Sequence, residues 1–207
     1  VSNARLQRVM VSCVEAGLKV ELFSCGNKCD LPVGVTFHSV SKGSRITRVA
    51  NSLALPWRAR GRVLFTPDPE GAIAIWLSTF VRKRPWVVDV REDYSLLIED
   101  RGWAKGSRKY MALLLSKIAV FACARADVTV VVDDWVRPLQ AKKRIVVRNS
   151  PDVRFLPDAK DPDANPRALY VGDVRRSRGL WSMLRTLELA PEWHLDIVGT
   201  ISSEDIS

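Results

Sequence analysis

A dense group of ionisable side chains follows an apolar run near the middle of this chain. The run covers residues 86–88, and four charged side chains come directly after it: Asp89, Arg91, Glu92 and Asp93. Apolar residues on both faces are typical of a buried strand in a parallel sheet, and the abrupt polar end marks its carboxyl tip. Because ligands of open α/β sheets bind beyond those tips, we expect the group to line a binding site.

The same group has a structural alternative. Closely spaced carboxylates repel one another unless cations lie between them. Arg91 and Arg101 are the candidate partners, and together they would form a cluster of ion pairs with no ligand. Upstream, Asp68 follows another predicted strand and precedes Pro69. It suits the N-cap of a helix, and facing the same site is its alternative role.

A second candidate site is the turn between Gly172 and Gly179, which joins a predicted strand to a predicted helix. It holds Arg175, Arg176 and Arg178. Backbone amides and the helix dipole at such a turn point toward an anion, so the turn predicts phosphate binding. A solvated basic turn is the alternative.

Other chemistries lack their sequence patterns. The chain has no Gly-x-x-x-x-Gly-Lys-Ser/Thr phosphate loop and no Gly-x-Gly-x-x-Gly dinucleotide fingerprint. Cys25 and Cys29 have no nearby histidine and make a poor zinc site. The two histidines, His38 and His194, have no catalytic partner in the sequence. We therefore expect no metal and no cofactor.

Composition is that of a folded protein with anionic partners. The 207 residues are 47% hydrophobic and 27% charged, and the net charge is +9. Such a balance favours phosphates, acidic membrane surfaces or nucleic acid, but no nucleic-acid-binding signature appears, so nucleic acid is not expected. No apolar run is long enough to cross a membrane. The few cysteines are interpreted as reduced thiols, which indicates that the protein is located in the cytoplasm.

Helical and strand patterns alternate along the sequence. The predicted helices cover residues 4–16, 44–57, 70–82, 107–125 and 177–190. The predicted strands cover residues 18–23, 35–40, 63–65, 87–90, 128–132, 145–147, 168–172 and 194–198. This alternation predicts an α/β fold: a doubly wound, Rossmann-like parallel sheet with right-handed crossovers, followed by the first βαβ of a second Rossmann-like domain.

A polar, proline-rich segment at 157–166 is the predicted linker between a domain at 1–156 and a second one at 167–207. The helix at 44–57 and its flanks are rich in basic residues: Lys42, Arg45, Arg48, Arg58, Arg60 and Arg62. The pattern suits a helix that lies on an anionic membrane, and it equally suits a helix that covers a sheet with a charged outer face.

Four segments, in order, resemble the retaining GT-B glycosyltransferases of family four. Asp68-Pro69-Glu70 and the stretch from Asp89 to Tyr94 are similar to two motifs of its acceptor-side domain. Residues 147–152 resemble the crossover into its donor domain. Residues 168–173, with 178–180, resemble the opening of that donor domain. The resemblance covers nearly the whole chain.

The resemblance implies transfer of a sugar from a nucleotide-sugar donor to a glycan or lipid-linked acceptor, with retention and without a metal. It places Arg91 and Glu92 as the catalytic candidates. The acceptor side would be lined by Asp68, Asp89, Asp93 and Tyr94. The donor phosphates would be held by Gly172, Arg175, Arg176, Arg178 and Gly179.

Two positions depart from the family pattern, in which Arg91 is often a histidine and Asp173 usually an arginine. A guanidinium cannot accept a proton, although it binds phosphate or carboxylate in a fork. The resemblance also implies that a first strand and most of the donor domain are missing. We expect a cytoplasmic glycosyltransferase fragment that is inactive by itself, with peripheral contact at the inner membrane face. The alternative is a degenerate, non-catalytic GT-B-like module that binds a sugar, a membrane or a protein.

Overall fold

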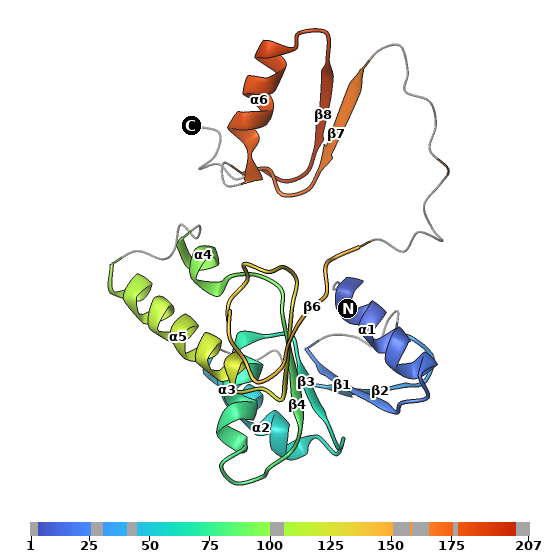
Figure 1. Cartoon of the computed structure of the whole chain (residues 1–207), viewed down its shortest axis with the longest axis vertical. Helices are drawn as coiled ribbons and strands as arrows, with labels where there is room; N and C mark the ends of the chain where they lie inside the picture. Colours follow the sequence, from blue (N-terminus) through green and yellow to red (C-terminus); the bar gives the residue numbers. More distant parts are fainter. Residues whose placement is uncertain are drawn as a thin grey trace. The chain divides into compact units, whose positions relative to one another are not determined.

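The computed structural model describes residues 4–25, 31–40, 45–99, 106–150, 158, 166–175 and 178–201. The chain divides into two compact units, Val1–Ser150 and Pro151–Ser207 (Figure 1). Each unit is described by itself. Most of the predicted linker at 157–166, and also Arg101, lie outside the described residues.

The centre of the first unit is a parallel sheet of four strands in the order β3-β4-β5-β6. The strands are β3 (Leu64–Thr66), β4 (Trp86–Val90), β5 (Val128–Val131) and β6 (Arg144–Val146). Val88 of β4 pairs with Thr66 on one side and Thr129 on the other. Helices flank this sheet, and the predicted Rossmann-like α/β fold is confirmed.

The remaining two strands of the first unit form a sheet of their own. β1 (Val20–Ser24) and β2 (Val35–Ser39) pair in parallel, and α1 (Ala4–Glu15) precedes them. The sequence predicted one continuous sheet. Among the described residues no strand pairs with β1 on its other side or with the free side of β3, so the hydrogen-bond ladder is interrupted there.

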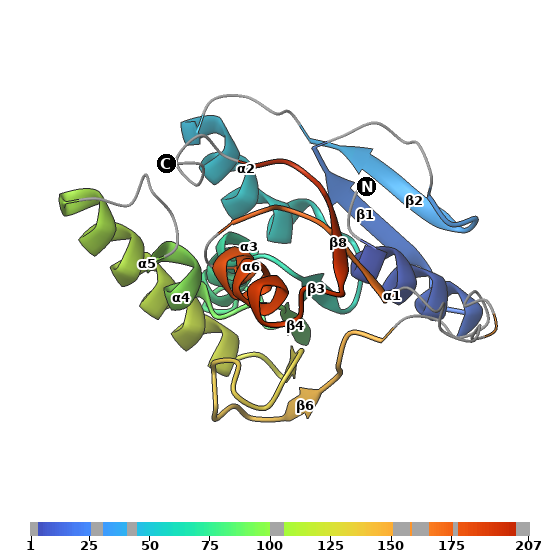
Figure 2. The ribbon, with the colours of Figure 1, turned by 90° about the horizontal axis from the view of Figure 1, so that it is seen from above.

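Four further helices belong to the first unit: α2 (Arg45–Arg58), α3 (Pro69–Ser78), α4 (Tyr94–Glu99) and α5 (Ser107–Ala124). In both Figure 1 and Figure 2, α1 and α5 lie at opposite ends of this unit. α3 ends four residues before its predicted end. The hydroxyls of Ser78 and Thr79 donate to the carbonyls of Ile75 and Trp76 and compete with the helical ladder.

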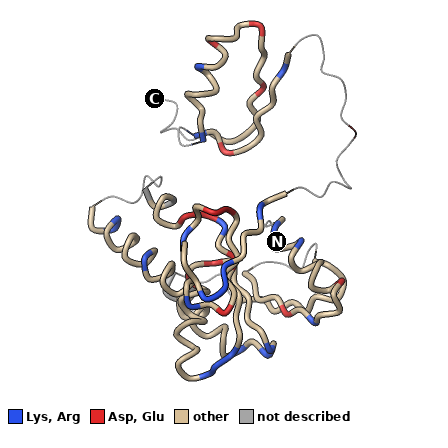
Figure 3. Tube along the Cα trace, viewed as in Figure 1, with Lys and Arg blue, Asp and Glu red and all other residues tan. Residues whose placement is uncertain are grey.

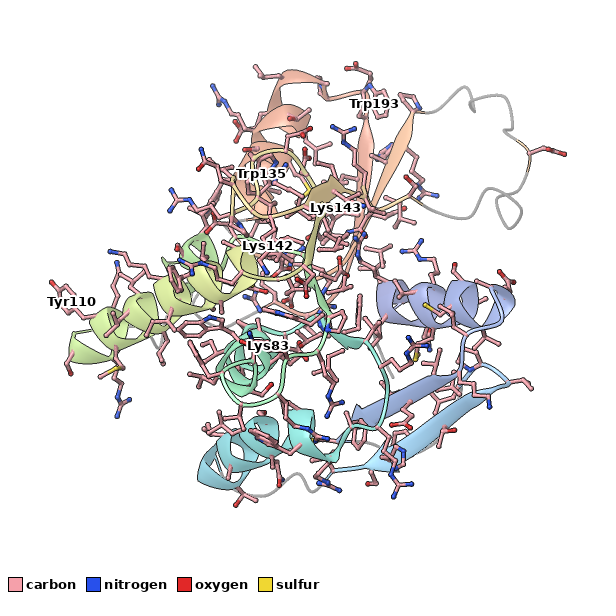
Figure 4. All side chains as sticks on the ribbon, turned by 60° about the horizontal axis from the view of Figure 1, so that its bottom comes forward. Lys83, Tyr110, Trp135, Lys142, Lys143 and Trp193 are labelled. Carbon is pink, nitrogen blue, oxygen red and sulfur yellow. The ribbon has the colours of Figure 1, made fainter. Side chains whose placement is uncertain are left out.

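The core lies between the four-stranded sheet and helices α3 and α5. Val88, Val90 and Val131 are fully buried, and they meet small residues of the two helices, Ala72 and Ala122. Small side chains let the helix backbones approach the sheet closely. The outer side of α5 keeps several large apolar residues exposed, among them Tyr110, Met111, Leu114 and Leu115; Figure 4 labels Tyr110.

The described residues of the second unit form one βαβ element, as the sequence predicts. β7 (Arg167–Val171) and β8 (His194–Val198) pair in parallel, and α6 (Leu180–Leu189) connects them. Its described core is small, with Val174 and Leu180 as the buried apolar residues. No helix among the described parts of either unit is long and apolar enough to cross a membrane.

Candidate functional site

The carboxyl ends of the four-stranded sheet carry most of the residues that the sequence singles out. The loop after β3 holds Asp68, the loop after β4 holds residues 91–93, and the loop after β5 holds Asp133 and Asp134. Because the strands are parallel, these loops gather at one edge of the sheet. Charges of both signs lie along them (Figure 3).

Arg91 joins the loops that follow β3 and β4. Its Nη2 lies 3.5 Å from the Asp68 carboxylate and donates a hydrogen bond to the carbonyl of Pro67 at 3.4 Å. Asp68 occupies the N-cap position of α3, as the sequence predicts, but its side chain makes no capping hydrogen bond. Loss of surrounding water raises the pKa of Asp68, Arg91 opposes this shift, and Glu70 adds to it.

Tyr94 belongs to the same group. Its hydroxyl is buried and has no hydrogen-bond partner among the described residues. Burial raises the pKa of this phenol, and the charges of Asp68 and Arg91 both act on it. Native structures satisfy most buried polar atoms, so an unpaired hydroxyl beside an ion pair is unusual. We call these three residues the Asp68–Arg91–Tyr94 site.

Tyr94→Phe is expected to raise the free energy of unfolding by about 1 kcal/mol, because it removes a buried hydroxyl that pays its desolvation cost without a partner. Urea denaturation checks this. The gain should grow above pH 10: the raised pKa means that the phenol ionises first in the unfolded state, which destabilises the parent as pH rises. A variant less stable than the parent would show that the hydroxyl already has a structural role.

The structure does not bring Asp89 into this site. Asp89 is 3% exposed and pairs with Arg5 of α1 rather than with Arg91. Arg5 donates to both carboxylate oxygens at 2.8 Å, and also to the carbonyl of Val147 and the side chain of Asn149. This one guanidinium therefore holds α1 against the ends of β4 and β6.

The two remaining carboxylates of the central group differ in role. Asp93 is buried, and its Oδ1 accepts hydrogen bonds from the amides of Ser95 and Leu96, which caps α4. Its other oxygen lies 3.7 Å from Arg137. Glu92 is exposed and forms no ion pair with a described residue. Asp93 is therefore structural, and Glu92 is available to a ligand.

An ion pair neutralises part of the positive charge of the predicted phosphate-binding turn in the second unit. Arg175 pairs with Asp173 at 2.6 Å, and Thr200 donates to the same carboxylate at 2.9 Å. Arg178 is exposed, but its amide and that of Leu180 both donate to the carbonyl of Arg175. Arg176 lies outside the described residues. Of the arginines that the structure describes at this turn, Arg178 is thus the one whose side chain is exposed and available to an anion.

Glycines shape the backbone of the same turn. Gly179 precedes α6 with φ +83°, a left-handed conformation that favours glycine. Gly172 has φ +155° and lies against Gly199: a Cβ at position 199 would lie 1.7 Å from the carbonyl oxygen of Gly172. These contacts bring the ends of β7 and β8 together beside the start of α6.

Among the described residues no group of three histidine, cysteine, aspartate or glutamate side chains could hold a metal ion. No protein-family model matches the chain, and no curated protein matches it either. The candidate function therefore depends on the geometry described above and on the resemblance of the four sequence segments.

Proposed function

We propose that this chain is part of a retaining glycosyltransferase. The first unit would receive the acceptor, a glycan or a lipid-linked sugar, and the second would bind the diphosphate of a nucleotide-sugar donor. The observation that supports this most is the Asp68–Arg91–Tyr94 site. It places a partly exposed ion pair at the carboxyl edge of a parallel sheet, where ligands of such sheets bind, while the half-buried Tyr94 side chain packs against the core.

The proposed reaction forms a bond between an acceptor hydroxyl oxygen and the anomeric carbon of the donor, on the same face that the diphosphate leaves, so the configuration is retained. The bond from that carbon to the diphosphate breaks, and the diphosphate leaves with the electron pair. Glu92, which is exposed, would bind a hydroxyl of a sugar and accept its proton, a task that Arg91 cannot perform. Arg178 and the start of α6 would stabilise the charge on the leaving diphosphate, without a metal or other cofactor.

A non-catalytic binding module is the second candidate. Two arginines expected to meet substrate are engaged within the protein, since Arg91 pairs with Asp68 and Arg175 pairs with Asp173. A module of this kind would bind a sugar, a membrane or a protein without transfer. Both candidates fit a cytoplasmic protein with peripheral contact at the inner membrane face, and neither requires nucleic acid.

Arg178→Ala is expected to weaken binding of a nucleoside diphosphate by about 1.5–3 kcal/mol, the contribution of a hydrogen bond to a charged group. Calorimetric titration with UDP and GDP measures it. Arg185→Ala is the matched control, because Arg185 is an exposed arginine of α6 that pairs with Glu188. Unchanged affinity in Arg178→Ala, or an equal loss in the control, contradicts the donor-phosphate site.

A transfer assay separates the two candidates. Arg91→His places at this position the residue that family members often carry, and we compare it with the parent on UDP- and GDP-sugars. Product formed by either protein, and lost on Glu92→Gln, supports the enzyme. Diphosphate binding without product in both proteins, each assayed as the complete natural polypeptide, supports the binding module.

A further inference from the structure

A basic depression lies at the amino-terminal edge of the four-stranded sheet, the edge opposite the Asp68–Arg91–Tyr94 site. Its volume is about 750 Å³, and two segments line it, residues 57–62 before β3 and residues 82–85 before β4. We call it the basic basin. Its cationic residues are Arg58, Arg60, Arg62, Arg82, Lys83 and Arg84. No aspartate or glutamate is among the lining residues.

Pairing of β3 with β4 creates this concentration of charge. Leu64 pairs with Trp86, so the loops that precede the two strands lie side by side. Basic residues are prominent at this end of the first unit in Figure 3, and Lys83 is labelled in Figure 4. The two basic segments are about twenty residues apart in the chain, and the sheet register brings them to one place.

Arg84 gives the basin a fixed framework. Its guanidinium donates to the carbonyls of Ala59, Gly61 and Pro56 at 2.8, 3.1 and 2.9 Å. The side chain is half-buried, and it ties the loop before β3 and the end of α2 to the loop before β4. The shape of the basin therefore depends on Arg84, whereas neutralising the other cations removes no described hydrogen bond that supports the backbone.

The other five cations have no structural partner in the described part of the chain. Arg58, Arg60, Arg62, Arg82 and Lys83 are exposed, and none forms an ion pair with a described carboxylate. The nearby carboxylate of Glu21 accepts from the backbone amide of Arg60 at 3.3 Å, not from its guanidinium.

The end of α3 does not require these cations either. Helix C-terminal carbonyls attract positive charge when they are unsatisfied. Here the amides of Thr79, Phe80 and Arg82 already donate to the carbonyls of Ile75, Leu77 and Ser78. The hydroxyl of Thr79 donates to the carbonyl of Trp76. The carbonyls at the end of the helix therefore do not require the positive charge of Arg82 and Lys83.

We propose that the basic basin binds clustered phosphate groups. Arginine forks match phosphate oxygens in two-point hydrogen bonds, and several arginines around one depression suit several phosphates. Apolar side chains accompany the charge: Trp57 in the lining is 44% exposed, and Phe80 and Val81, which directly precede the lining residue Arg82, are 72% and 75% exposed. Anionic lipid headgroups and soluble polyphosphates both offer this chemistry. The inference is independent of the proposed glycosyltransferase activity.

The test compares two variants of equal charge. The basin variant carries R60Q, R62Q, R82Q and K83Q and keeps Arg84, so the framework of the basin is retained. The control variant carries R108Q, K109Q, K117Q and K143Q, which lie on α5 and before β6 and line no part of the basin. The probes are inorganic tripolyphosphate, and phosphatidylcholine vesicles with and without phosphatidylglycerol. Circular dichroism and thermal unfolding check that both variants fold.

We expect the parent to bind at least one probe, and the basin variant to bind it more than about 10-fold more weakly. Each lost charge-assisted hydrogen bond contributes about one factor of ten. The control should change less than about 3-fold. Binding of tripolyphosphate assigns a soluble phosphate ligand, and binding of anionic vesicles alone assigns a lipid headgroup. Failure of the parent to bind either probe, or equal losses in the two variants, overturns the proposal, as does parent binding that added salt does not weaken.

Discussion

Replacing Arg5 with methionine is expected to lower the free energy of unfolding by about 3–5 kcal/mol. The side chains of Arg5 and Asp89 are 10% and 4% exposed, and their closest atoms lie 2.8 Å apart. Removal of the guanidinium leaves the Asp89 carboxylate buried without a counter-charge. It also leaves the carbonyl of Val147 and the amide side chain of Asn149 without their donor. Urea denaturation followed by circular dichroism measures the loss.

Two further variants identify the cause. Arg5→Met combined with Asp89→Leu should recover most of the lost stability, because a buried apolar pair replaces a buried ion pair at little cost. Arg8→Met is the matched control on α1: Arg8 is exposed and donates to the carbonyl of Ser150. It should change stability by less than about 0.5 kcal/mol. If the single and double variants lose equally, the ion pair is not what holds α1 in place.

Trp86→Ala is expected to cost about 3–5 kcal/mol of unfolding free energy, the usual range for a buried tryptophan. Trp86 begins β4, is 2% exposed and belongs to the main core cluster. Asp127 accepts a hydrogen bond from its backbone amide at 3.0 Å and donates one to its carbonyl at 3.1 Å, so the backbone at this position stays fixed when the ring is removed. The cavity left behind can therefore collapse only in part. Chemical denaturation of the variant gives the value.

Trp135→Ala provides the comparison for this loss. Trp135 is 59% exposed in the loop after β5 (Figure 4), so its removal should change stability by less than about 1 kcal/mol. Similar losses for the two tryptophans would mean that β4 does not form the centre of the core. β4 carries Asp89 and is followed directly by Arg91. A large loss for Trp86→Ala and a small loss for Trp135→Ala would therefore also show that core packing supports the strand that leads to the candidate site.

The sheet could be predicted from local pattern because its strands are short apolar runs that end in charge. Residues 86–88 identify β4 directly, and the polar residues after it mark the edge where Asp68, Arg91 and Tyr94 meet. The sequence pattern did not predict helix α4, because its six residues show too little periodicity. The structure shows that Asp93, a residue type that suits an N-cap, caps this helix.

The contacts that decide the roles of the charged residues could not be predicted. Arg5 and Asp89 are 84 positions apart, and no local pattern indicates that they pair. For the same reason the sequence grouped Arg58, Arg60 and Arg62 with the helix at 44–57. Only the pairing of β3 with β4 shows that they share a depression with Arg82 and Lys83.

The interrupted ladder between β1 and β3 bears on how this protein behaves when it is concentrated. In the described residues every sheet ends in strands that pair on one side only, which leaves backbone donors and acceptors available to another chain. β3 and β6 are three residues long, and such short edges offer few groups. β1, β2, β7 and β8 are five residues long. Self-association would therefore start at the two-stranded sheets, and the net charge of +9 opposes it until salt screens that repulsion.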